Sequence, residues 1–334
     1  MTKISVVILN WNGKRFLEKF LKSVVSNIDN SNTDIWVADN GSTDSSVSVI
    51  QDNFPDVKLI CFDKNYGFTG GYNKALSLIE AEYYILLNSD VEVTPNWIEP
   101  VIEQFEKNPQ IAAAAPKIKS LEEKQKFEYA GAAGGYIDYL GFPFCRGRVL
   151  SSIETDSGQY DTAKSVFWAS GACMFIRASI FHQSGGFDNL FFAHMEEFDL
   201  CWRMKNAGYL IYCFPQSTVY HVGGGTLPNN NPHKLYLNYR NNLLLLYKNL
   251  PTPKKNRILI KRFFFDMASA FMFLLQFKGS FTLSVLKAYR DFFKLKKKYP
   301  ADNSVSKKHN EMLNKSIVLN FFFRRKNKFS DYGL

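Results

Sequence analysis

Residues 4–13, ISVVILNWNG, set a pattern that the first part of the chain repeats. The run from Ile4 to Leu9 is almost wholly apolar and partly β-branched, which is typical of a strand buried on both faces of a parallel sheet. A turn containing Gly13 follows. The next apolar residues stand at helical spacing: Phe16, Leu17, Phe20, Leu21 and Val24. The stretch therefore predicts a strand, a turn and a helix, in that order.

The same unit recurs three times before Pro95. Strands are predicted at Ile35–Ala38, Val57–Phe62 and Tyr83–Leu87, each followed by a polar or glycine-rich turn. Helices are predicted after Ser42 and around Ala75–Ile79, the latter after a glycine-rich loop. Repeated strand–loop–helix units of this kind predict an α/β fold with an open, mostly parallel, Rossmann-like sheet flanked by helices.

The pattern loosens after Pro116. Residues 117–165 mix glycine, tyrosine and charged residues with little periodicity. Beyond them we expect a strand-like run over Ser165–Ile176, a helix over Glu196–Ala207 and a short strand over Tyr209–Phe214. A stretch rich in glycine, asparagine and proline, Gly223–Pro232, predicts a boundary. These features predict two halves: one over 1–115 that binds the substrate that donates a group, and one over 116–233 that faces the substrate that accepts it. They are called the donor-binding half and the acceptor-facing half below.

The charge of the chain is divided between two regions. The 334 residues carry a net charge of +10, but residues 1–233 hold 19 Lys and Arg against 26 Asp and Glu. Residues 234–334 hold 22 against 5, a net charge of +17. An acidic body therefore precedes a basic, aromatic-rich helical appendage, and such a segment suits an anionic partner, either nucleic acid or a lipid surface.

The pattern of the appendage favours a lipid surface. The apolar run Phe263–Phe277 has 15 residues and contains Asp266, whereas a membrane-spanning helix needs about 20 apolar residues. Basic residues on either side of the run suit helices that lie in the interface of an anionic membrane. Nucleic-acid binding calls for aromatic residues interleaved with basic ones, and here they gather in helix-like blocks, so we expect no nucleic acid. Packing of these helices on the body is the alternative.

Cysteine usage and the N-terminus point to the cytoplasm. The five cysteines are scattered and form no C-x-x-C pair, which argues against a disulfide framework or a structural zinc site. The apolar run at the N-terminus meets Asn10 within a few residues, unlike a signal peptide. We therefore expect a protein of a reducing compartment.

Polar clusters stand directly after the predicted strands, where doubly wound sheets bind their ligands. Asp39 ends the second strand and could accept hydrogen bonds from a nucleobase or a ribose, although an Asx-turn is the alternative. Residues 65–73, NYGFTGGYN, hold three glycines before a helix, an arrangement that lets backbone amides approach phosphate oxygens. A Lys-Ser or Lys-Thr pair does not follow, so this is not a P-loop.

Acidic residues supply the candidate chemistry. Asp90 follows a hydrophobic strand, and a carboxylate there can hold a divalent cation that also binds a diphosphate. Glu196, Glu197 and Asp199 open a predicted helix, where acids are also favoured by the helix dipole. His221 precedes three glycines and is a candidate metal ligand, although an isolated histidine is more often structural.

Taken in order, seven segments resemble the inverting family-2 glycosyltransferases of the GT-A fold, especially the rhamnosyltransferase-like bacterial branch. The segments are VVILNWNG, VADNGSTDSS, NYGFTGGYN, LLNSDVEV, WASGACMFIR, GGFDNLFFAHMEEFDLCWR and YHVGGGT. The resemblance covers about residues 3–245.

The resemblance implies a role for each matching residue. The residues implied to bind the sugar-nucleotide donor are Asp39, Asn65, Gly67, Gly71, Asn73 and Ser89. Asp90 and His221 are implied to hold a divalent metal, Mg²⁺ or Mn²⁺, and Glu197 to be the catalytic base. Trp168, Gly171 and Glu196 are implied to border the acceptor. The chain departs from the family at two positions, because the D-x-D motif begins with Asn88 and the usual Glu-Asp pair reads Glu196-Glu197.

The implied activity is transfer of a sugar with inversion in cell-surface polysaccharide synthesis. The donor would be a nucleoside-diphosphate sugar, most simply dTDP- or UDP-linked, and the acceptor a saccharide or a polyprenyl-linked saccharide. The enzyme would work peripherally on the cytoplasmic face of the inner membrane. A sugar-nucleotide nucleotidyltransferase is the alternative enzyme, but it would place a basic, glycine-rich loop after the first strand, where Asn10-Trp11-Asn12-Gly13 stands.

Overall fold

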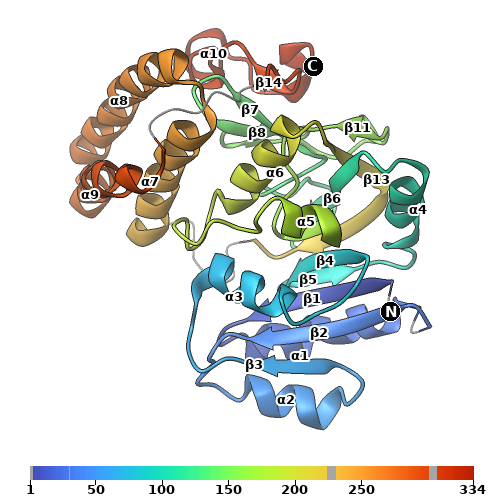
Figure 1. Ribbon diagram of the computed structural model, residues 1–334. Coiled ribbons are helices and arrows are strands. Elements are labelled where there is room, and N and C mark those ends of the chain that lie inside the picture. Colours follow the sequence, from blue (N-terminus) through green and yellow to red (C-terminus); the bar gives the residue numbers. More distant parts are fainter. Residues whose placement is uncertain (1–2, 30, 224–230, 301–306) are drawn as a thin grey trace.

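A large mixed sheet forms the centre of the molecule (Figure 1). The computed structural model describes residues 3–29, 31–223, 231–300 and 307–334. In this part of the chain one sheet has nine strands, eight of them in the order β11-β13-β6-β12-β4-β1-β2-β3, and β5 pairs with β13. A second sheet has five strands in the order β10-β9-β8-β7-β14.

The N-terminal half consists of the strand–helix units that the sequence predicts. Its parallel strands are β1 (Ile4–Asn10), β2 (Thr33–Asp39), β3 (Lys58–Cys61) and β4 (Tyr83–Asn88). Its helices are α1 (Lys14–Ser26), α2 (Ser46–Asn53) and α3 (Gly67–Leu76). Helix α1 buries the predicted face of Leu17, Phe20, Leu21 and Val24. One prediction is wrong here: α3 begins at Gly67, so the glycine-rich stretch forms the first turns of the helix rather than a loop.

The remaining strands reverse and then restore the strand direction. They are β5 (Val91–Val93), β6 (Ile111–Ser120), β11 (Lys164–Ser165), β12 (Cys173–Arg177) and β13 (Leu210–His221). Strand β12 runs antiparallel to both β4 and β6, and β13 runs parallel to β6. Strands β1, β2, β4, β6 and β13 therefore all end at the same edge of the sheet. The helices between these strands are α4 (Glu99–Lys107), α5 (Ala178–Gln183) and α6 (Glu196–Asn206).

Three strands differ from the predictions. Strand β6 was not expected, because its sequence IAAAAPKIKS is rich in alanine and contains a proline, both uncommon in strands. The strand-like run Ser165–Ile176 is a strand only from Cys173. Strand β13 is longer than predicted, because it passes Pro215 through a register shift and continues to His221.

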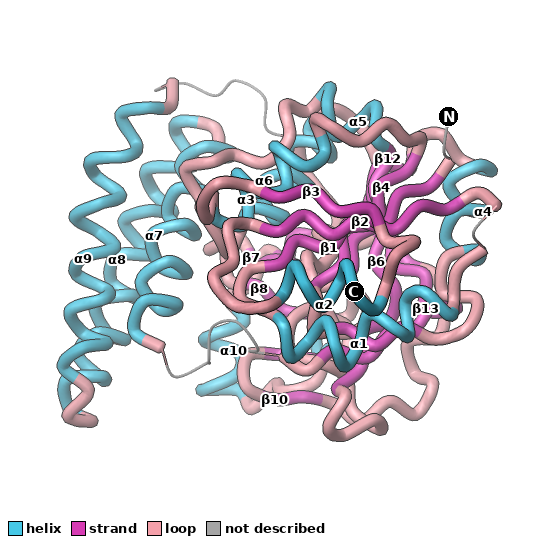
Figure 2. Tube along the Cα trace, turned by 90° about the horizontal axis from the view of Figure 1, so that it is seen from below, coloured by secondary structure: helices cyan, strands magenta, loops and turns pink. Residues whose placement is uncertain are grey.

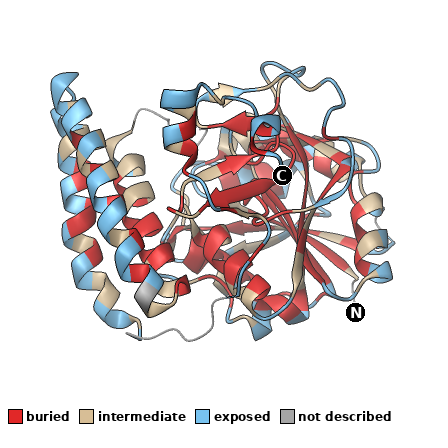
Figure 3. Ribbon diagram, turned by 90° about the horizontal axis from the view of Figure 1, so that it is seen from above, coloured by how far each residue is buried: buried red, intermediate tan, exposed pale blue. Residues whose placement is uncertain are grey.

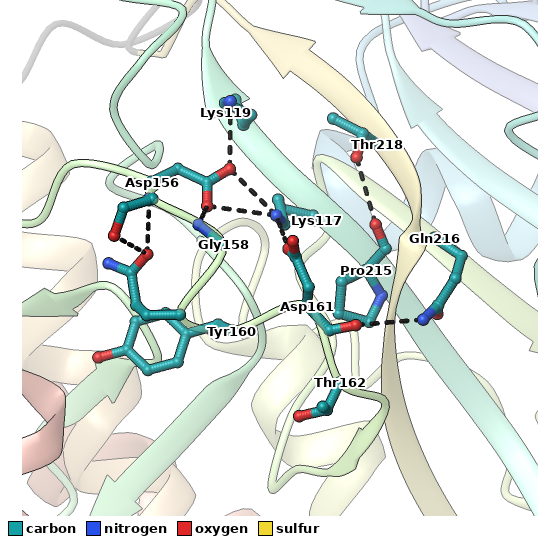
Figure 4. A network of polar contacts seen from close by, with 12 residues as sticks. Lys117, Lys119, Asp156, Gly158, Tyr160, Asp161, Thr162, Pro215, Gln216 and Thr218 are labelled. Carbon is teal, nitrogen blue, oxygen red and sulfur yellow. Dashed lines mark hydrogen bonds and ion pairs between the residues drawn. The ribbon is translucent and has the colours of Figure 1, made fainter.

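The smaller sheet lies in the acceptor-facing half. Its strands are β7 (Gly135–Asp138), β8 (Pro143–Cys145), β9 (Arg148–Val149), β10 (Ser152–Ile153) and β14 (Met312–Leu313). The loop after β10 is tied to β6 by a network of charges in which Lys117 and Asp156 are buried and Asp161 is exposed (Figure 4). Lys117 contacts the carboxylates of Asp156 and Asp161, and Lys119 lies 3.1 Å from Asp156. Breaking a buried pair of this kind costs about 3–5 kcal/mol, so the network holds the loop in place.

The C-terminal region is helical. It comprises α7 (Pro232–Asn249), α8 (Thr252–Leu275), α9 (Gly279–Leu295) and α10 (Ile317–Arg324), with short 3₁₀ helices at Lys296–Lys298 and Phe329–Tyr332. Figure 2 shows α7, α8 and α9 as a layer beside the body. Among the described residues, these helices and the others are too short or too polar to cross a bilayer. The predicted α/β fold with a helical appendage is confirmed.

The helical region also returns to the body. Strand β14 pairs with β7, so residues near the C-terminus complete a sheet of the acceptor-facing half. The predicted boundary Gly223–Pro232 lies mostly outside the described residues, since 224–230 are not among them. The division into 1–233 and 234–334 stays a prediction.

Candidate active site

The predicted site residues gather at the edge where β1, β2, β4 and β13 end. A backbone hydrogen bond from Asn88, at the end of β4, to the carbonyl oxygen of Ala172 joins β4 to the turn before β12. Strand β5 pairs with the last residues of β13, with Val91 opposite His221. The topology therefore brings segments from four distant parts of the sequence to one place.

Asp39 is buried in a polar cluster at the ends of β1 and β2. Its carboxylate accepts hydrogen bonds from the side-chain amide of Asn10 (2.9 Å) and from the backbone amide (2.9 Å) and hydroxyl (2.6 Å) of Ser42. The Ser42 amide is three residues after Asp39, one more than in the Asx-turn that the sequence left open, so the carboxylate closes a slightly wider local turn. The binding of the sugar-nucleotide donor by Asp39 stays a prediction.

The first turn of α3 is docked on the segment before α6. The backbone amides of Phe68 and Thr69 both donate to the carbonyl oxygen of Phe192, at 2.8 and 3.2 Å. Gly67 has a φ of +74°, and a Cβ atom there would lie 2.5 Å from the Phe192 ring. Glycine is therefore required at position 67, but the reason is the docking of α3 and not the approach to a phosphate. In this arrangement the amides expected to approach phosphate are engaged with protein.

Gly71, Asn65 and Asn73 also support the packing of α3. A Cβ atom on Gly71 would lie 2.7 Å from Leu9, so the absence of a side chain lets α3 approach β1. The Asn65 side chain accepts a hydrogen bond from the amide of Gly67 at 2.7 Å. The Asn73 side chain both donates to and accepts from the backbone of Phe187. The contacts of these three residues therefore hold α3 in place, and their binding of the donor stays a prediction.

Asp90 and His221 meet as the register of β5 and β13 requires. Both are buried, and His221 Nε2 lies 3.1 Å from Asp90 Oδ1. His221 Nδ1 lies 3.5 Å from a carboxylate oxygen of Glu128, which is long for a hydrogen bond. Burial alone lowers the pKa of His221, but the hydrogen bonds and charges of Asp90 and Glu128 outweigh it and raise that pKa to about 10. Ser89, predicted to bind the donor, is half-buried beside Asp90.

The side chains of Asp90 and His221 offer atoms that suit a hard divalent cation. A carboxylate oxygen and a neutral imidazole nitrogen are ligands that Mg²⁺ and Mn²⁺ accept, together with phosphate and water oxygens. Because the pKa of His221 is raised, a cation that binds here must displace a proton from its ring. Nδ1 of His221 is buried without a hydrogen bond of normal geometry, so the ring is held mainly through Asp90. Within the described ranges, no three His, Cys, Asp or Glu side chains are arranged around a single metal position. The protein therefore offers two ligands, and a diphosphate would have to supply others.

Glu196 is buried and Glu197 is half-buried, and neither acid has a full set of partners. One carboxylate oxygen of each is buried with no hydrogen-bond partner among the described residues. Burial raises the pKa of Glu197 to about 7, against an opposing backbone hydrogen bond from Gly171. Burial and the charge of Glu197 raise the pKa of Glu196 well above its ordinary range. An acid that titrates near neutral pH can accept a proton under physiological conditions.

Gly171 lies against Glu197, and Trp168 lies behind both. A Cβ atom on Gly171 would lie 3.4 Å from the Phe68 ring and 3.9 Å from Glu197 Oε1, so this glycine keeps the approach to the acid open. Trp168 is 2% exposed, donates to the carbonyl oxygen of Tyr136 at 2.9 Å and stacks on Phe198. Its ring faces protein, so it positions α6 instead of presenting a surface to an acceptor.

Asp199, the third acid of α6, is fully paired. Its carboxylate accepts from Arg203, Lys248 and Asn249 at 2.8–2.9 Å. The pair with Arg203, one turn on, is an i,i+4 ion pair within α6. Burial alone raises the pKa of Asp199, but the charges of Arg203 and Lys248 hold it below its ordinary value. Lys248 and Asn249 belong to α7, so the helical region anchors the acidic helix.

Three residues of the site were not predicted: Asn10, Phe68 and Glu128. Asn10 stands at the end of the first strand, and this position was a signal that could have identified it. Phe68 stands between two glycines of the glycine-rich stretch. Glu128 lies in the region of loose pattern, and only the fold brings it to His221.

Comparison with known proteins decides the class of this site. The model of the family described as glycosyl transferase family 2 matches residues 5–185, more than half of the chain. The chain belongs to this family. It is a glycosyltransferase, and the alternative of a nucleotidyltransferase is set aside.

The most informative relative supports the resemblance to the rhamnosyltransferase-like branch. This glycosyltransferase is 27% identical over 233 residues to the N-acetylglucosaminyl-diphospho-decaprenol L-rhamnosyltransferase of Mycobacterium tuberculosis. The match covers 65% of this chain and 75% of the relative. The predicted family and branch are confirmed.

Solved structures support the GT-A fold of this glycosyltransferase. GalNAc-T7 with UDP, GalNAc and Mn²⁺ matches with a TM-score of 0.58 and 16% identity, over 75% of this chain and 48% of that chain. S. aureus TarS 1-349 in complex with UDP-GlcNAc matches with a TM-score of 0.57 and 14% identity, over 87% and 81%. At such identities the likeness concerns the fold alone, and the fold is the predicted one.

Proposed function

We propose that this glycosyltransferase moves a sugar from a nucleoside-diphosphate donor to a saccharide acceptor, with inversion and with Glu197 as the base. One observation carries the proposal. Two incompletely paired carboxylates, each with one buried oxygen that has no hydrogen-bond partner, stand at the same edge of the sheet as the Asp90–His221 pair: the buried Glu196 and the half-buried Glu197. Keeping acids buried without partners costs stability, and such sites are characteristic of function.

The reaction needs one proton transfer and one displacement. Glu197 accepts the proton of the acceptor hydroxyl as that oxygen forms its bond to the anomeric carbon of the donor sugar. The bond from that carbon to the diphosphate oxygen breaks, and its electron pair leaves with the diphosphate. A single displacement inverts the configuration of the carbon. Glu196, beside the base, would orient the acceptor, and Asp39 the nucleoside.

The proposed site includes a divalent cation, Mg²⁺ or Mn²⁺. Asp90 and His221 would hold it, and the structure of GalNAc-T7, which shares the fold, carries Mn²⁺. When bound, such a cation offsets the negative charge that grows on the departing diphosphate. Glu128, 3.5 Å from Nδ1 of His221, would have to approach the ring more closely to orient it as a carboxylate behind a ligating histidine commonly does. We propose a UDP- or dTDP-linked donor, since the TarS structure of this fold contains UDP-GlcNAc.

We further propose a lipid-linked saccharide as the acceptor, in cell-surface polysaccharide synthesis. The mycobacterial relative is named for a diphospho-decaprenol substrate. In the present chain, α8 carries an outward stripe of Ile260, Phe264, Phe271 and Leu275, each more than half exposed. The acid of this helix, Asp266, is buried, and Arg257 is exposed near the stripe.

An apolar stripe beside basic residues suits the interface of an anionic membrane. Figure 3 shows exposed residues along the outer side of the helical layer. Peripheral binding to the cytoplasmic face of the inner membrane is therefore part of the proposal. It predicts that the protein sediments with anionic vesicles and that Phe264→Ser with Phe271→Ser releases it. If the double variant sediments as much as the wild type, the proposed peripheral binding to the membrane is refuted.

A donor screen tests the central proposal. Thermal stability is measured with UDP-, dTDP- and GDP-sugars, with and without Mg²⁺ or Mn²⁺, and the stabilising donor is then used in transfer assays. A donor at 100 times its dissociation constant adds about 2.7 kcal/mol to the unfolding free energy. Asp90→Ala should lose transfer and the metal dependence of donor binding. Glu92→Ala, which removes a surface ion pair with Lys124, is the matched control and should retain both. Full transfer by Asp90→Ala would refute the metal site.

A further inference from the structure

A cavity of about 380 Å³ opens between the helical region and the acceptor-facing half. Its walls come from α8, α10 and two loops of the smaller sheet, which Figure 1 shows at one end of the molecule. The apolar lining includes Tyr129, Phe142, Leu150, Phe265, Val318 and Phe322. The volume falls in the range of about 300–1,000 Å³ that is typical of small-molecule sites.

The polar side chains in the buried part of the cavity, Asp266, Ser269 and Tyr239, are engaged with protein, whereas Tyr129 and Ser151 are exposed. Asp266 is buried against Arg262 at 3.1 Å and accepts from the Tyr289 hydroxyl at 2.9 Å. The Ser269 hydroxyl lies 2.6 Å from that of Tyr239. A sugar or a nucleotide needs several unengaged polar partners, because an unpaired polar group is costly to bury. The cavity therefore suits an uncharged hydrocarbon.

One end of the cavity adjoins the active site. Tyr129 follows Glu128, the carboxylate beside His221. Because neighbouring Cα atoms are about 3.8 Å apart, a ligand that contacts Tyr129 lies one residue from the carboxylate behind the proposed metal ligand His221.

The other end reaches the apolar surface of the helical region. Phe322 lines the cavity and is 67% exposed, and its neighbour Phe323 is 81% exposed. Phe264, on the outward stripe of α8, precedes the lining residue Phe265. The cavity therefore connects the active site with the surface that we assign to the membrane.

We propose that this cavity binds the first isoprene units of a polyprenyl-linked acceptor. The inference rests on the proposed function, since it names the part of the acceptor that the helical region recognises. An acyl chain of a bulk lipid would also be apolar, but it has no reason to approach the transferring groups. The chain of the acceptor must do so, because it is joined through phosphate to the sugar that receives the new one. The rest of the chain would remain in the membrane.

A labelling experiment that requires no transfer tests the cavity. The full-length protein is irradiated with farnesyl phosphate carrying a terminal diazirine, and the labelled peptides are identified by mass spectrometry. We expect label on the peptides that contain Leu150 and Phe322. A dodecyl phosphate probe with the same diazirine represents an acyl chain and should label them about tenfold less. Equal labelling by both probes, or label elsewhere, would overturn the proposal.

A matched pair of variants on α10 sharpens the test. Val318→Trp fills the cavity and should reduce farnesyl labelling by about tenfold. Leu319→Trp adds the same ring at the next position, which is 45% exposed, and should leave labelling unchanged. If Val318→Trp does not fold, Ser151→Trp in the opposite wall takes its place. Unchanged labelling in the folded cavity variant would also overturn the proposal.

Transfer assays separate this inference from the proposed function. With a polyprenyl-linked acceptor, Val318→Trp should raise KM about tenfold, whereas a water-soluble acceptor with a short chain should be transferred as in the wild type. If Val318→Trp does not affect transfer to the polyprenyl-linked acceptor, the proposed role of the cavity is refuted and the proposed enzyme activity is not. Labelling in the cavity without transfer to either acceptor would instead refute the proposed acceptor, while it would still show that the cavity binds a hydrocarbon chain.

Discussion

Helix α6 holds two different acids within a single turn, the buried Asp199 and the half-buried Glu197. Asp199 accepts from Arg203, Lys248 and Asn249, and its pKa is held below the ordinary value. Glu197, two residues earlier, keeps a buried carboxylate oxygen without a partner, and its pKa rises to about 7. The local sequence and the helix dipole are almost the same for both, so the difference arises from what the rest of the fold brings to each.

The comparison separates a structural acid from a reactive one. Helix α7 supplies a cation and an amide to Asp199, which ties the acidic helix to the helical region. The side of α6 that carries Glu197 meets Gly171, which adds no side chain. An acid that must accept a proton during a reaction cannot be saturated with permanent cations, because these would lower its pKa.

The largest effect is expected from removing the reactive acid. Glu197→Gln keeps the shape of the side chain and removes its basicity, so turnover should fall about 10²–10⁴-fold. Donor affinity should change little, because the lost interaction operates mainly in the transition state. Turnover from single-turnover assays and donor affinity from calorimetry check both statements. Glu196→Gln is the neighbouring control, and if it alone shows the loss, the base moves by one residue.

Removing the structural acid should affect folding first. Asp199→Asn leaves Lys248 and Arg203 without their shared carboxylate, and breaking such a buried pair costs about 3–5 kcal/mol. Urea denaturation measures this change in unfolding free energy. Glu103→Gln breaks the exposed pair with Lys107 on α4 and should cost less than about 1 kcal/mol. Similar costs for the two variants would mean that Asp199 is not the anchor described above.

A smaller and opposite effect is expected for the stability of Glu197→Gln. The folded protein raises the pKa of Glu197 from 4.5 to about 7, so it binds this proton more tightly than the unfolded chain does. The corresponding stability is present below pH 4.5 and is lost as the pH rises through about 7. Glutamine cannot lose a proton, so above neutral pH the variant should be more stable than the wild type, by on the order of 1 kcal/mol. Parallel pH–stability curves would argue against a buried, unpaired carboxylate.

Much of the fold follows from local patterns. The strand–helix units up to β4 are legible because apolar runs and helical spacing alternate there without interruption. Strand β6 is not, because alanine and proline hide a strand that only its neighbours β12 and β13 stabilise. The start of α3 was missed because glycine is a poor helix former, and the contact with Phe192 overrides that preference.

The site is less legible than the fold. Motifs at strand ends predict that Asp39 and Asp90 share one edge, since parallel strands end together, whereas the place of Glu197 is implied only by the resemblance to the family. They do not predict Glu128, whose approach to His221 depends on a segment without periodic pattern. They also do not distinguish Asp199 from Glu197, because the cation that separates them, Lys248, lies about fifty residues away in another helix.

The pH dependence of single-turnover transfer tests the central claim most directly. With donor saturating, the account predicts that the wild-type rate falls as the pH drops through about 7, where Glu197 takes up its proton. The same acid limb should be absent from the residual activity of Glu197→Gln. An acid limb near 4.5, the ordinary value for a glutamate, or an unchanged limb in the variant would contradict the assignment of Glu197 as the base.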